Sequence, residues 1–279
     1  MHDRPRRART ARWLVVAALA TSPGTACRAP VSQPAEGPIA DDIKTSLQSG
    51  GASFEHGAWD RLLAAGTRDG QVDYAYFARE REQLDHYLAG LASAELATLS
   101  PDHLKALLIN AYNALTVKSI LDNPGVASIR EIDGVWKKVE HTVGGHPLTL
   151  DEIEHNLLRP FWKDPRIHFA VNCASASCAP LPGWAYDGAA LEAQLEERTR
   201  SFLADRSQVR IEDGALKVSK YFDWYGDDFQ QEGWEPRAET WLQFIAAYGP
   251  RPVAEHIAAA SGRPAVTFLD YDWSLNAAP

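Results

Sequence analysis

The sequence predicts an α+β fold: a single mixed domain with a central helix and a small internal sheet. Three patterns predict it. Residues 101–121 have the caps and apolar composition of a long buried helix, residues 166–173 alternate as an internal strand, and residues 210–219 have the turn of a hairpin. The 279 residues, 45% of them hydrophobic, are enough to bury one core.

The N-terminus predicts an exported protein. Residues 1–12 carry five arginines, and residues 13–20 are apolar. A basic segment, a short apolar segment and small residues make up a secretory signal peptide, here residues 1–26. The small residues before Cys27 also resemble a lipoprotein cleavage site, so lipidation of Cys27 and simple cleavage after Ala26 both fit. We expect a periplasmic or outer-membrane lipoprotein.

Composition predicts a tether and one domain after the leader. Residues 27–51 are rich in Pro, Ala, Ser, Gln and Gly, which indicates a flexible tether before one globular domain at 52–279. Loss of residues 1–26, with five Arg and one Asp, changes the formal charge from −9 to −13. This acidity argues against nucleic acid as a partner. We expect the binding partner to be an unknown small molecule or a peptide of the cell envelope. We expect the protein to contact the membrane only through a lipid anchor.

The helix expected at 101–121 has signals at both ends. Ser100 is placed to cap it, Pro101 fits its first turn, and Pro and Gly at 124–125 close it. Asn110 and Asn113 interrupt its apolar residues, and buried asparagines need hydrogen-bond partners. They either brace a neighbouring loop or line a substrate site.

A hairpin and a short helix come next in the chain. Residues 140–146 turn at two glycines, which is typical of a hairpin. Thr149 and Glu152 have the spacing of a capping box for a helix at 151–159, which Pro160 is expected to end.

That helix carries a candidate catalytic histidine. His155 lies four residues from both Asp151 and Arg159, and it comes directly after Glu154. A carboxylate at such a position can orient an imidazole as a general base. The alternative is a histidine of the capping turn or the surface.

The strand expected at 166–173 ends at a thiol. His168 and Asn172 share one of its faces, and Cys173 is its last residue. Small residues come after it, and their backbone N–H groups could face an anion or a carbonyl oxygen. A thiol beside such a loop is placed as a nucleophile. Residues that could contact substrate there are Asn172, Ser175 and Ser177.

Cys173 and Cys178 are also a candidate disulfide. Nearby cysteines often pair in an oxidising compartment, although so small a loop gains little stability. No cofactor and no metal are expected, because EF-hand and zinc-helix spacings are absent from the sequence.

Local patterns also predict the C-terminal elements. A hairpin is expected at 210–219, with its turn at Asp213 and Gly214. Helices are expected at 237–248 and 252–260, and a late strand at 266–270.

Five segments together resemble a known family. They are INAYNALTVKSIL, LTLDEIEHNLLRP, DPRIHFAVNCASASCAPL, KVSKYFDWYGDDF and FLDYDWSLN. Their order over residues 55–276 is similar to that of the family called domain of unknown function 547, which includes secreted or lipid-anchored bacterial proteins. The resemblance implies no activity, substrate or cofactor. It marks as motif positions Asn110, Asn113, Glu154, His155, His168, Cys173 and Cys178.

The sequence leaves two functions open. The first is a thiol hydrolase or acyl transferase acting on an amide or ester, with Cys173 as nucleophile, His155 or His168 as base, and Glu154 or an asparagine orienting the base. The second is a non-catalytic binding or scaffold module. In it the loop from Cys173 to Cys178 is structural, and the asparagines and histidines satisfy buried hydrogen bonds.

Overall fold

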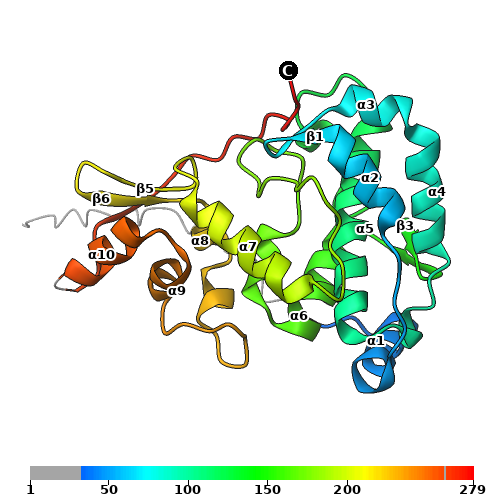
Figure 1. Cartoon of the computed structure of the whole chain (residues 1–279), viewed down its shortest axis with the longest axis horizontal. Coiled ribbons are helices and arrows are strands. Elements are labelled where there is room, and N and C mark those ends of the chain that lie inside the picture. The colour runs from blue at the N-terminus through cyan, green and yellow to red at the C-terminus, as the bar shows by residue number, and fades with distance from the viewer. Residues whose placement is uncertain (1–32, 261) are drawn as a thin grey trace, which may run out of the picture.

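The computed structural model describes residues 33–260 and 262–279. Its central element is helix α5 (Pro101–Leu121), which other helices surround (Figure 1). The Oγ of Ser100 accepts a hydrogen bond from the N–H of His103, and nearly every residue from Leu104 to Ile120 is buried. The predicted central helix is therefore confirmed.

The helices before α5 pack around it. Trp59 in α2 stacks on Tyr87 in α4 at 5.8 Å between ring centroids, and both rings are buried. The elements of this half are α2 (Gly57–Gly66), β1 (Thr67–Arg68), β2 (Gln71–Val72), α3 (Tyr74–Arg79), α4 (Arg81–Ala92) and η1 (Leu96–Thr98).

A further helix, α1 (Pro38–Ser49), occupies much of the expected tether. Its side chains Ile39 and Ile43 are buried, and the Ser46 Oγ donates to the Leu99 carbonyl at 2.7 Å. The prediction of a flexible tether is therefore wrong for residues 38–49. One apolar stripe on an otherwise polar segment is enough to attach a helix to the domain. The expected signal peptide and Cys27 lie outside the described residues.

After η2 (Ile129–Glu131), the expected hairpin forms as β3 (His141–Val143) and β4 (His146–Leu148). The capping box is also present. The N–H of Thr149 donates to a carboxylate oxygen of Glu152 at 2.8 Å, and the N–H of Glu152 donates back to the Thr149 hydroxyl at 3.2 Å.

The helix after this box differs from the expected one. It is the π-helix η3 (Glu152–Leu158), in which the N–H of Arg159 donates to the carbonyl of Glu154, and it continues as α6 (Arg159–Trp162). Pro160 therefore does not end it. Proline lacks an N–H group, so the Asn156 carbonyl accepts instead from the N–H of Ala35 at 2.9 Å. This bond holds the segment before α1 against η3.

The strand expected at 166–173 does not form. Residues Pro165–Phe169 are the 3₁₀ helix η4, which Asp164 caps by accepting from the Arg166 N–H at 2.9 Å, and the segment after it is irregular. All of residues 164–172 are buried. Because both faces are apolar, alternation could not distinguish a strand from another buried conformation.

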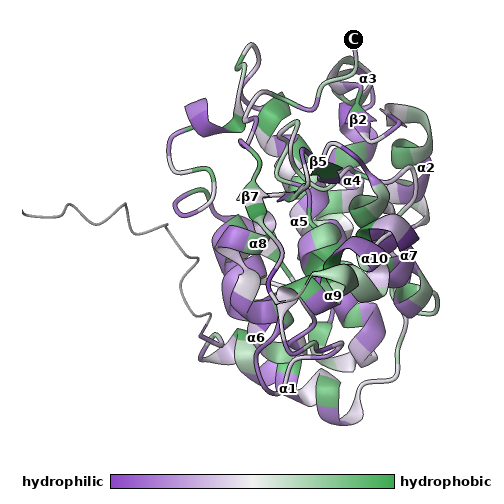
Figure 2. Cartoon of the chain, turned by 90° about the vertical axis from the view of Figure 1, so that its left-hand side faces the viewer, coloured by the Kyte–Doolittle hydropathy of each residue, from purple (hydrophilic) through white to green (hydrophobic). Residues whose placement is uncertain are grey.

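The C-terminal third forms a second group of elements (Figure 1). Strand β6 pairs antiparallel with β5 and parallel with β7, which confirms the expected hairpin and late strand. Figure 2 shows both hydrophilic and hydrophobic positions, in purple and green, along the helices of this part of the chain. The elements are α7 (Leu191–Ala204), β5 (Val209–Glu212), β6 (Ala215–Val218), α8 (Tyr221–Trp224), η5 (Gly226–Phe229), α9 (Trp241–Tyr248), α10 (Arg251–Ala259) and β7 (Val266–Phe268).

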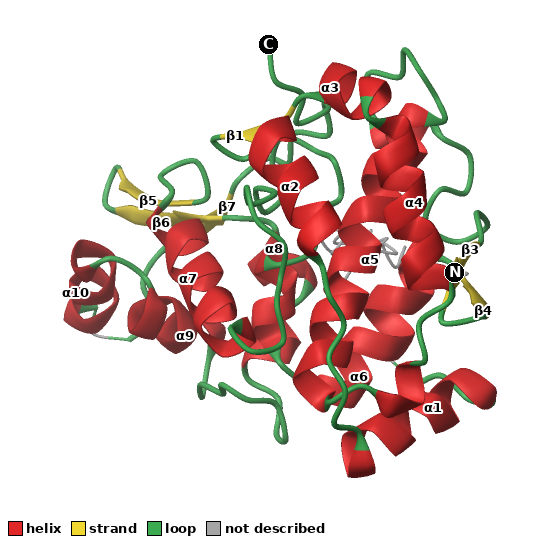
Figure 3. Ribbon diagram, turned by 45° about the vertical axis from the view of Figure 1, so that its right-hand side comes forward, coloured by secondary structure: helices red, strands yellow, loops and turns green. Residues whose placement is uncertain are grey.

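The α+β class is confirmed, with short strands at the edges of a mainly helical body (Figure 3). Two apolar clusters form the core. One is centred on α5, and the other gathers Phe169, Phe202 and Phe229 with aromatic residues from α8 and α9. Across the described residues, none of the helices has the length and apolar character needed to cross a membrane.

Candidate functional site

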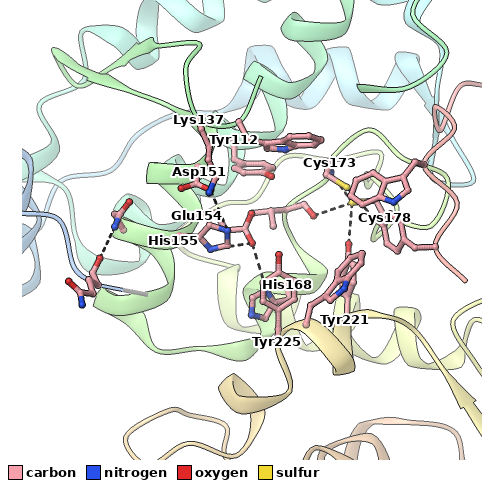
Figure 4. Close-up of a pocket in the computed structure, with 17 residues that line it drawn as sticks. Tyr112, Lys137, Asp151, Glu154, His155, His168, Cys173, Cys178, Tyr221 and Tyr225 are labelled. Carbon is pink, nitrogen blue, oxygen red and sulfur yellow. Dashed lines mark hydrogen bonds and ion pairs between the residues drawn. The ribbon is translucent and has the colours of Figure 1, made fainter. Parts of the chain in front are cut away.

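The two clusters meet at a cavity of about 460 Å³. α5 contributes Tyr112 to its wall, η3 contributes Glu154 and His155, and α8 contributes Tyr221. Figure 4 shows Cys173 and Cys178 on one side, with Glu154 and His155 facing them. Further lining residues are Trp136, His168, Trp224, Tyr225, Tyr271 and Trp273.

Cys173 lies half-buried in this wall. Its Sγ is 3.2 Å from the Tyr271 hydroxyl and 3.3 Å from the Ser175 Oγ, and these two hydroxyls are 2.8 Å apart. Ala174 has a φ of 60°, so the chain turns sharply directly after the thiol. This turn allows Ser175 to reach back to the sulfur two residues before it.

Both cysteines are free thiols, so the candidate disulfide is not formed. The N–H of Cys173 donates to the Cys178 Sγ at 2.8 Å. The Cys178 thiol, assisted by Ser175 and Tyr271, lowers the pKa of Cys173 to about 7 against the opposing effect of burial. Burial raises the pKa of Cys178 well above its ordinary value. Cys173 is therefore the reactive thiol of the two.

His168 is held by a buried ion-pair network. Its Nε2 lies 2.8 Å from Oδ2 of Asp228. The same carboxylate accepts two hydrogen bonds from Arg159, one on Oδ2 at 2.8 Å and one on Oδ1 at 2.9 Å. The ring stacks on Tyr225 with centroids 4.0 Å apart. Burial lowers the pKa of His168 despite the raising effect of Asp228. The neutral ring thus donates Nε2–H to Asp228, which leaves the Nδ1 lone pair without a donor among the described residues.

His155 is arranged differently. Its Nδ1 lies 3.0 Å from Nη1 of Arg159, and its Nε2 lies 3.8 Å from Asp151. A guanidinium only donates, so Nδ1 is the acceptor and its lone pair is already occupied. Neither His155 nor His168 makes a hydrogen bond to Cys173 in the part of the chain that the structure describes.

Glu154 lies between the two histidines. Its Oε1 is 3.9 Å from Nδ1 of His155 and 4.0 Å from Nδ1 of His168, both longer than a hydrogen bond. The side chain is 9% exposed. Within residues 33–260 and 262–279 its carboxyl group makes no hydrogen bond, so it does not orient either ring.

The asparagines expected to contact substrate instead brace the backbone. Asn110 donates to the carbonyl of Tyr186 at 2.7 Å and accepts from its N–H at 3.0 Å. Asn113 donates to the Ala170 carbonyl and accepts from the N–H of Asn172. The side chain of Asn172 is itself satisfied by the residues Ala174, Ala179 and Asn276. None of the three lines the cavity, and the substrate-contact prediction is wrong for them.

The loop after Cys173 has also used its donors. Ser175 bonds to the thiol, as described above, while Ser177 accepts from the N–H of Asp272 at 2.9 Å. The backbone N–H groups of Ala174, Ala176, Ser177 and Cys178 donate to other protein groups. The C-terminal segment around Ser274 provides two of these acceptors. These four N–H groups are therefore not available to the predicted oxyanion site. The N–H of Ser175 is instead directed at the Cys173 sulfur, where its hydrogen bond helps to lower the pKa of the thiol.

The described residues contain no group of three or more His, Cys, Asp or Glu side chains that could hold a metal ion. The carboxylate of Asp228, in the acidic and aromatic segment KYFDWYGDDF, is already bonded to His168 and Arg159.

A comparison with family models matches the part of the chain that holds the thiol. Residues 96–203 match the family described as Protein of unknown function, DUF547. The resemblance drawn from the sequence motifs is thus confirmed over this range. No curated protein and no solved structure matches the chain. The DUF547 match contains Glu154, His168 and Cys173, whereas Asp228 and Tyr271 lie beyond it.

Sequence reasoning missed the partners that define the site. The sequence did not connect Asp228, Arg159 or Tyr271 with His168 or Cys173, although the acidic aromatic segment KYFDWYGDDF contains Asp228 and Arg159 lies four residues after His155. Sixty positions separate Asp228 from His168, and 98 separate Tyr271 from Cys173. Pairing at such distances depends on the fold, and no local spacing indicates it.

Proposed function

We propose that this protein is a thiol-dependent hydrolase or acyl transferase that acts on an amide or ester. One observation carries the proposal: Cys173, with a pKa lowered to about 7, shares a cavity with the unoccupied Nδ1 of a histidine that Asp228 orients. A nucleophile and an oriented base around one reaction space are the two groups that acyl transfer requires.

In the first half-reaction the Cys173 thiolate attacks the carbonyl carbon. A carbon–sulfur bond forms, the carbon–oxygen or carbon–nitrogen bond of the substrate breaks, and the leaving group takes a proton from water, which balances the proton that the thiol released to water on ionising. No imidazole is needed to remove the proton of the thiol, because hydrogen bonds from Cys178, Ser175 and Tyr271 stabilise the thiolate.

In the second half-reaction His168 acts as the base. Its Nδ1 takes a proton from water or an acceptor alcohol or amine, whose heteroatom attacks the thioester carbon and expels the thiolate. The tyrosine hydroxyls of Tyr112 and Tyr225 point into the cavity (Figure 4) and are the candidate donors to the oxyanion. Burial raises the pKa of both, which keeps them protonated.

The N-terminal pattern supports a further part of this proposal. Residues 1–27 have the features of a signal peptide and lipidation site, so we propose that the protein is exported and acts on a small molecule or peptide of the cell envelope.

The test is formation of a covalent acyl-enzyme. The protein is mixed with p-nitrophenyl acetate, p-nitrophenolate release is followed by absorbance, and peptide mass spectrometry locates the acetyl group. We expect a burst of about one equivalent, with acetyl on Cys173 and a rate above that of N-acetylcysteine at the same pH. Cys173→Ala should abolish the burst, while Cys178→Ala should keep an acetylation site at Cys173.

Acetylation of Cys173 no faster than that of N-acetylcysteine would contradict the catalytic role. That result would favour the non-catalytic binding module, for which the satisfied asparagines are the supporting observation.

A further inference from the structure

Glu154 is a buried carboxyl group that the proposed chemistry does not use. It lines the cavity, its side chain is more than nine-tenths buried, and it makes no hydrogen bond within the described chain. A buried carboxyl group without a partner is costly, and proteins normally satisfy such a group with a cation or with hydrogen-bond donors. A ligand in the cavity can supply that partner.

The cations near Glu154 are committed elsewhere. Arg159 is close enough for Glu154 to contribute to its raised pKa, but its guanidinium donates twice to Asp228 and once to His155. Lys137 lies 3.7 Å from Asp151 and is largely exposed. Neither makes an ion pair with Glu154 within 4.0 Å.

The two histidines do not supply a positive charge either. His155 accepts from Arg159 at Nδ1, which a doubly protonated ring cannot do. His168 is buried and donates only to Asp228. Among the residues that the structure describes, no positively charged side chain therefore compensates the carboxyl group of Glu154 at the inner wall of the cavity.

Aromatic rings form the remaining walls. Trp224, Tyr271 and Trp273 pack together with centroids 4.5 to 6.1 Å apart, and Trp136 meets Trp273 edge-to-face at 6.2 Å. Faces of Trp and Tyr attract cations, more strongly when water is excluded. A carboxylate within an aromatic enclosure suits an ammonium group and disfavours an anion.

From this we infer that the cavity selects amides or esters that carry an ammonium group, which Glu154 binds while the acyl carbon lies at Cys173. The inference rests on the proposed thiol chemistry for the reacting bond. Figure 4 shows the two residues on facing sides of the cavity, which leaves room for a substrate chain between the charged end and the carbonyl.

The test measures binding, which does not require turnover. Three probes of similar length share one acetamide and differ in the other end: N-acetylputrescine is cationic, N-butylacetamide is neutral, and N-acetyl-γ-aminobutyrate is anionic. Each is titrated into the Cys173→Ala protein by calorimetry, with tryptophan fluorescence as the second readout. We expect the cationic probe to bind at least about tenfold more tightly than the neutral one, as for a charged hydrogen bond, and the anion to bind most weakly.

A second variant assigns the preference to Glu154. In Cys173→Ala, Glu154→Gln the cationic and neutral probes should bind within about threefold of each other. The matched control Asp151→Asn removes a carboxylate of the cavity rim that already faces Lys137, and it should keep the preference. Circular dichroism checks that each variant is folded.

Equal binding of the three probes to the Cys173→Ala protein overturns the inference without any need for the glutamate variant. A preference that survives Glu154→Gln also overturns it. The outcome is separable from that of the proposed function: cation-selective binding without an acyl-enzyme contradicts the catalysis alone, and an acyl-enzyme without cation selectivity contradicts the binding site alone.

Discussion

His168 and Asp228 form a 2.8 Å hydrogen bond between Nε2 and Oδ2, although they lie in separate segments of the chain. Arg159 bonds both carboxylate oxygens from the other side, and together these contacts keep the pKa of Asp228 below its ordinary range against the effect of burial. Asp228 is therefore a positioning residue. It fixes which nitrogen of His168 carries the proton.

Asp228→Asn tests this role. Loss of the charge should slow deacylation by about 10²–10⁴-fold, as for other histidine bases that lose their carboxylate. Asp228 also raises the pKa of His168, so its loss should move the acid limb of the pH–rate profile to lower pH. The exposed neighbour serves as control: Asp227→Asn should leave rate and profile nearly unchanged. A slower enzyme with an unmoved profile would indicate a purely structural role.

The second prediction concerns the pH dependence of Cys173. With a pKa of about 7, its alkylation by iodoacetamide should increase with pH to a midpoint near 7. Cys178 is the largest cause of the lowered pKa, so Cys178→Ala should move the midpoint upward. A rise of about one unit would reduce the thiolate present at pH 7 roughly fivefold.

Cys178→Ser is the matched control, because a hydroxyl can still donate to the thiolate. It should return the alkylation midpoint most of the way to that of the unsubstituted protein. An unchanged midpoint in Cys178→Ala would show that the second thiol does not tune the first.

Local signals explain which parts of the fold the sequence predicts. The helix-capping signals depend only on residues a few positions away in the chain. The structure contains those that were expected, at Ser100 and Pro101 and in the Thr149–Glu152 pair. The segment 166–173 lacks such a signal, because it is buried on all sides and its polar atoms pair with distant groups. Burial is visible in its composition, whereas its conformation depends on what surrounds it.

The same limit applies to the site. Cys173, His168 and Glu154 are residue types that suggest chemistry wherever they occur, and the structure places all three at one cavity. Asn110 and Asn113 are equally suggestive, yet they hold loop backbone. What distinguishes the two sets is whether the side chain lines the cavity or is turned toward loop backbone. The backbone partners of the asparagines lie up to 76 positions away, so no local pattern shows which case applies.

The third prediction concerns stability and His56. This histidine is buried, its Nδ1 bonds the Tyr87 hydroxyl at 2.8 Å, and burial lowers its pKa to about 4. The unfolded chain binds this proton near pH 6.5, so between about pH 6.5 and 4 the unfolded state holds more protons than the folded state. The free energy of unfolding should therefore fall by roughly 3 kcal/mol over that interval because of this residue.

Urea unfolding at pH 7.5, 5.5 and 4 measures this effect. His56→Gln should flatten the pH dependence by about that amount, while the exposed control His86→Gln should not. An equally steep dependence in His56→Gln would assign the acid sensitivity to other groups.

The last prediction tests whether α1 belongs to the domain. Ile43 is completely buried, whereas Leu47, one turn later, is 36% exposed. If α1 packs stably, Ile43→Ala leaves a cavity and should lower the free energy of unfolding by about 2–4 kcal/mol. Leu47→Ala should cost well under 1 kcal/mol, because little apolar contact is lost. Urea unfolding followed by tryptophan fluorescence compares the two. Equal and negligible effects would mean that residues 38–49 behave as the tether their composition suggests, and that the hydrogen bond from Ser46 to Leu99 does not persist in solution.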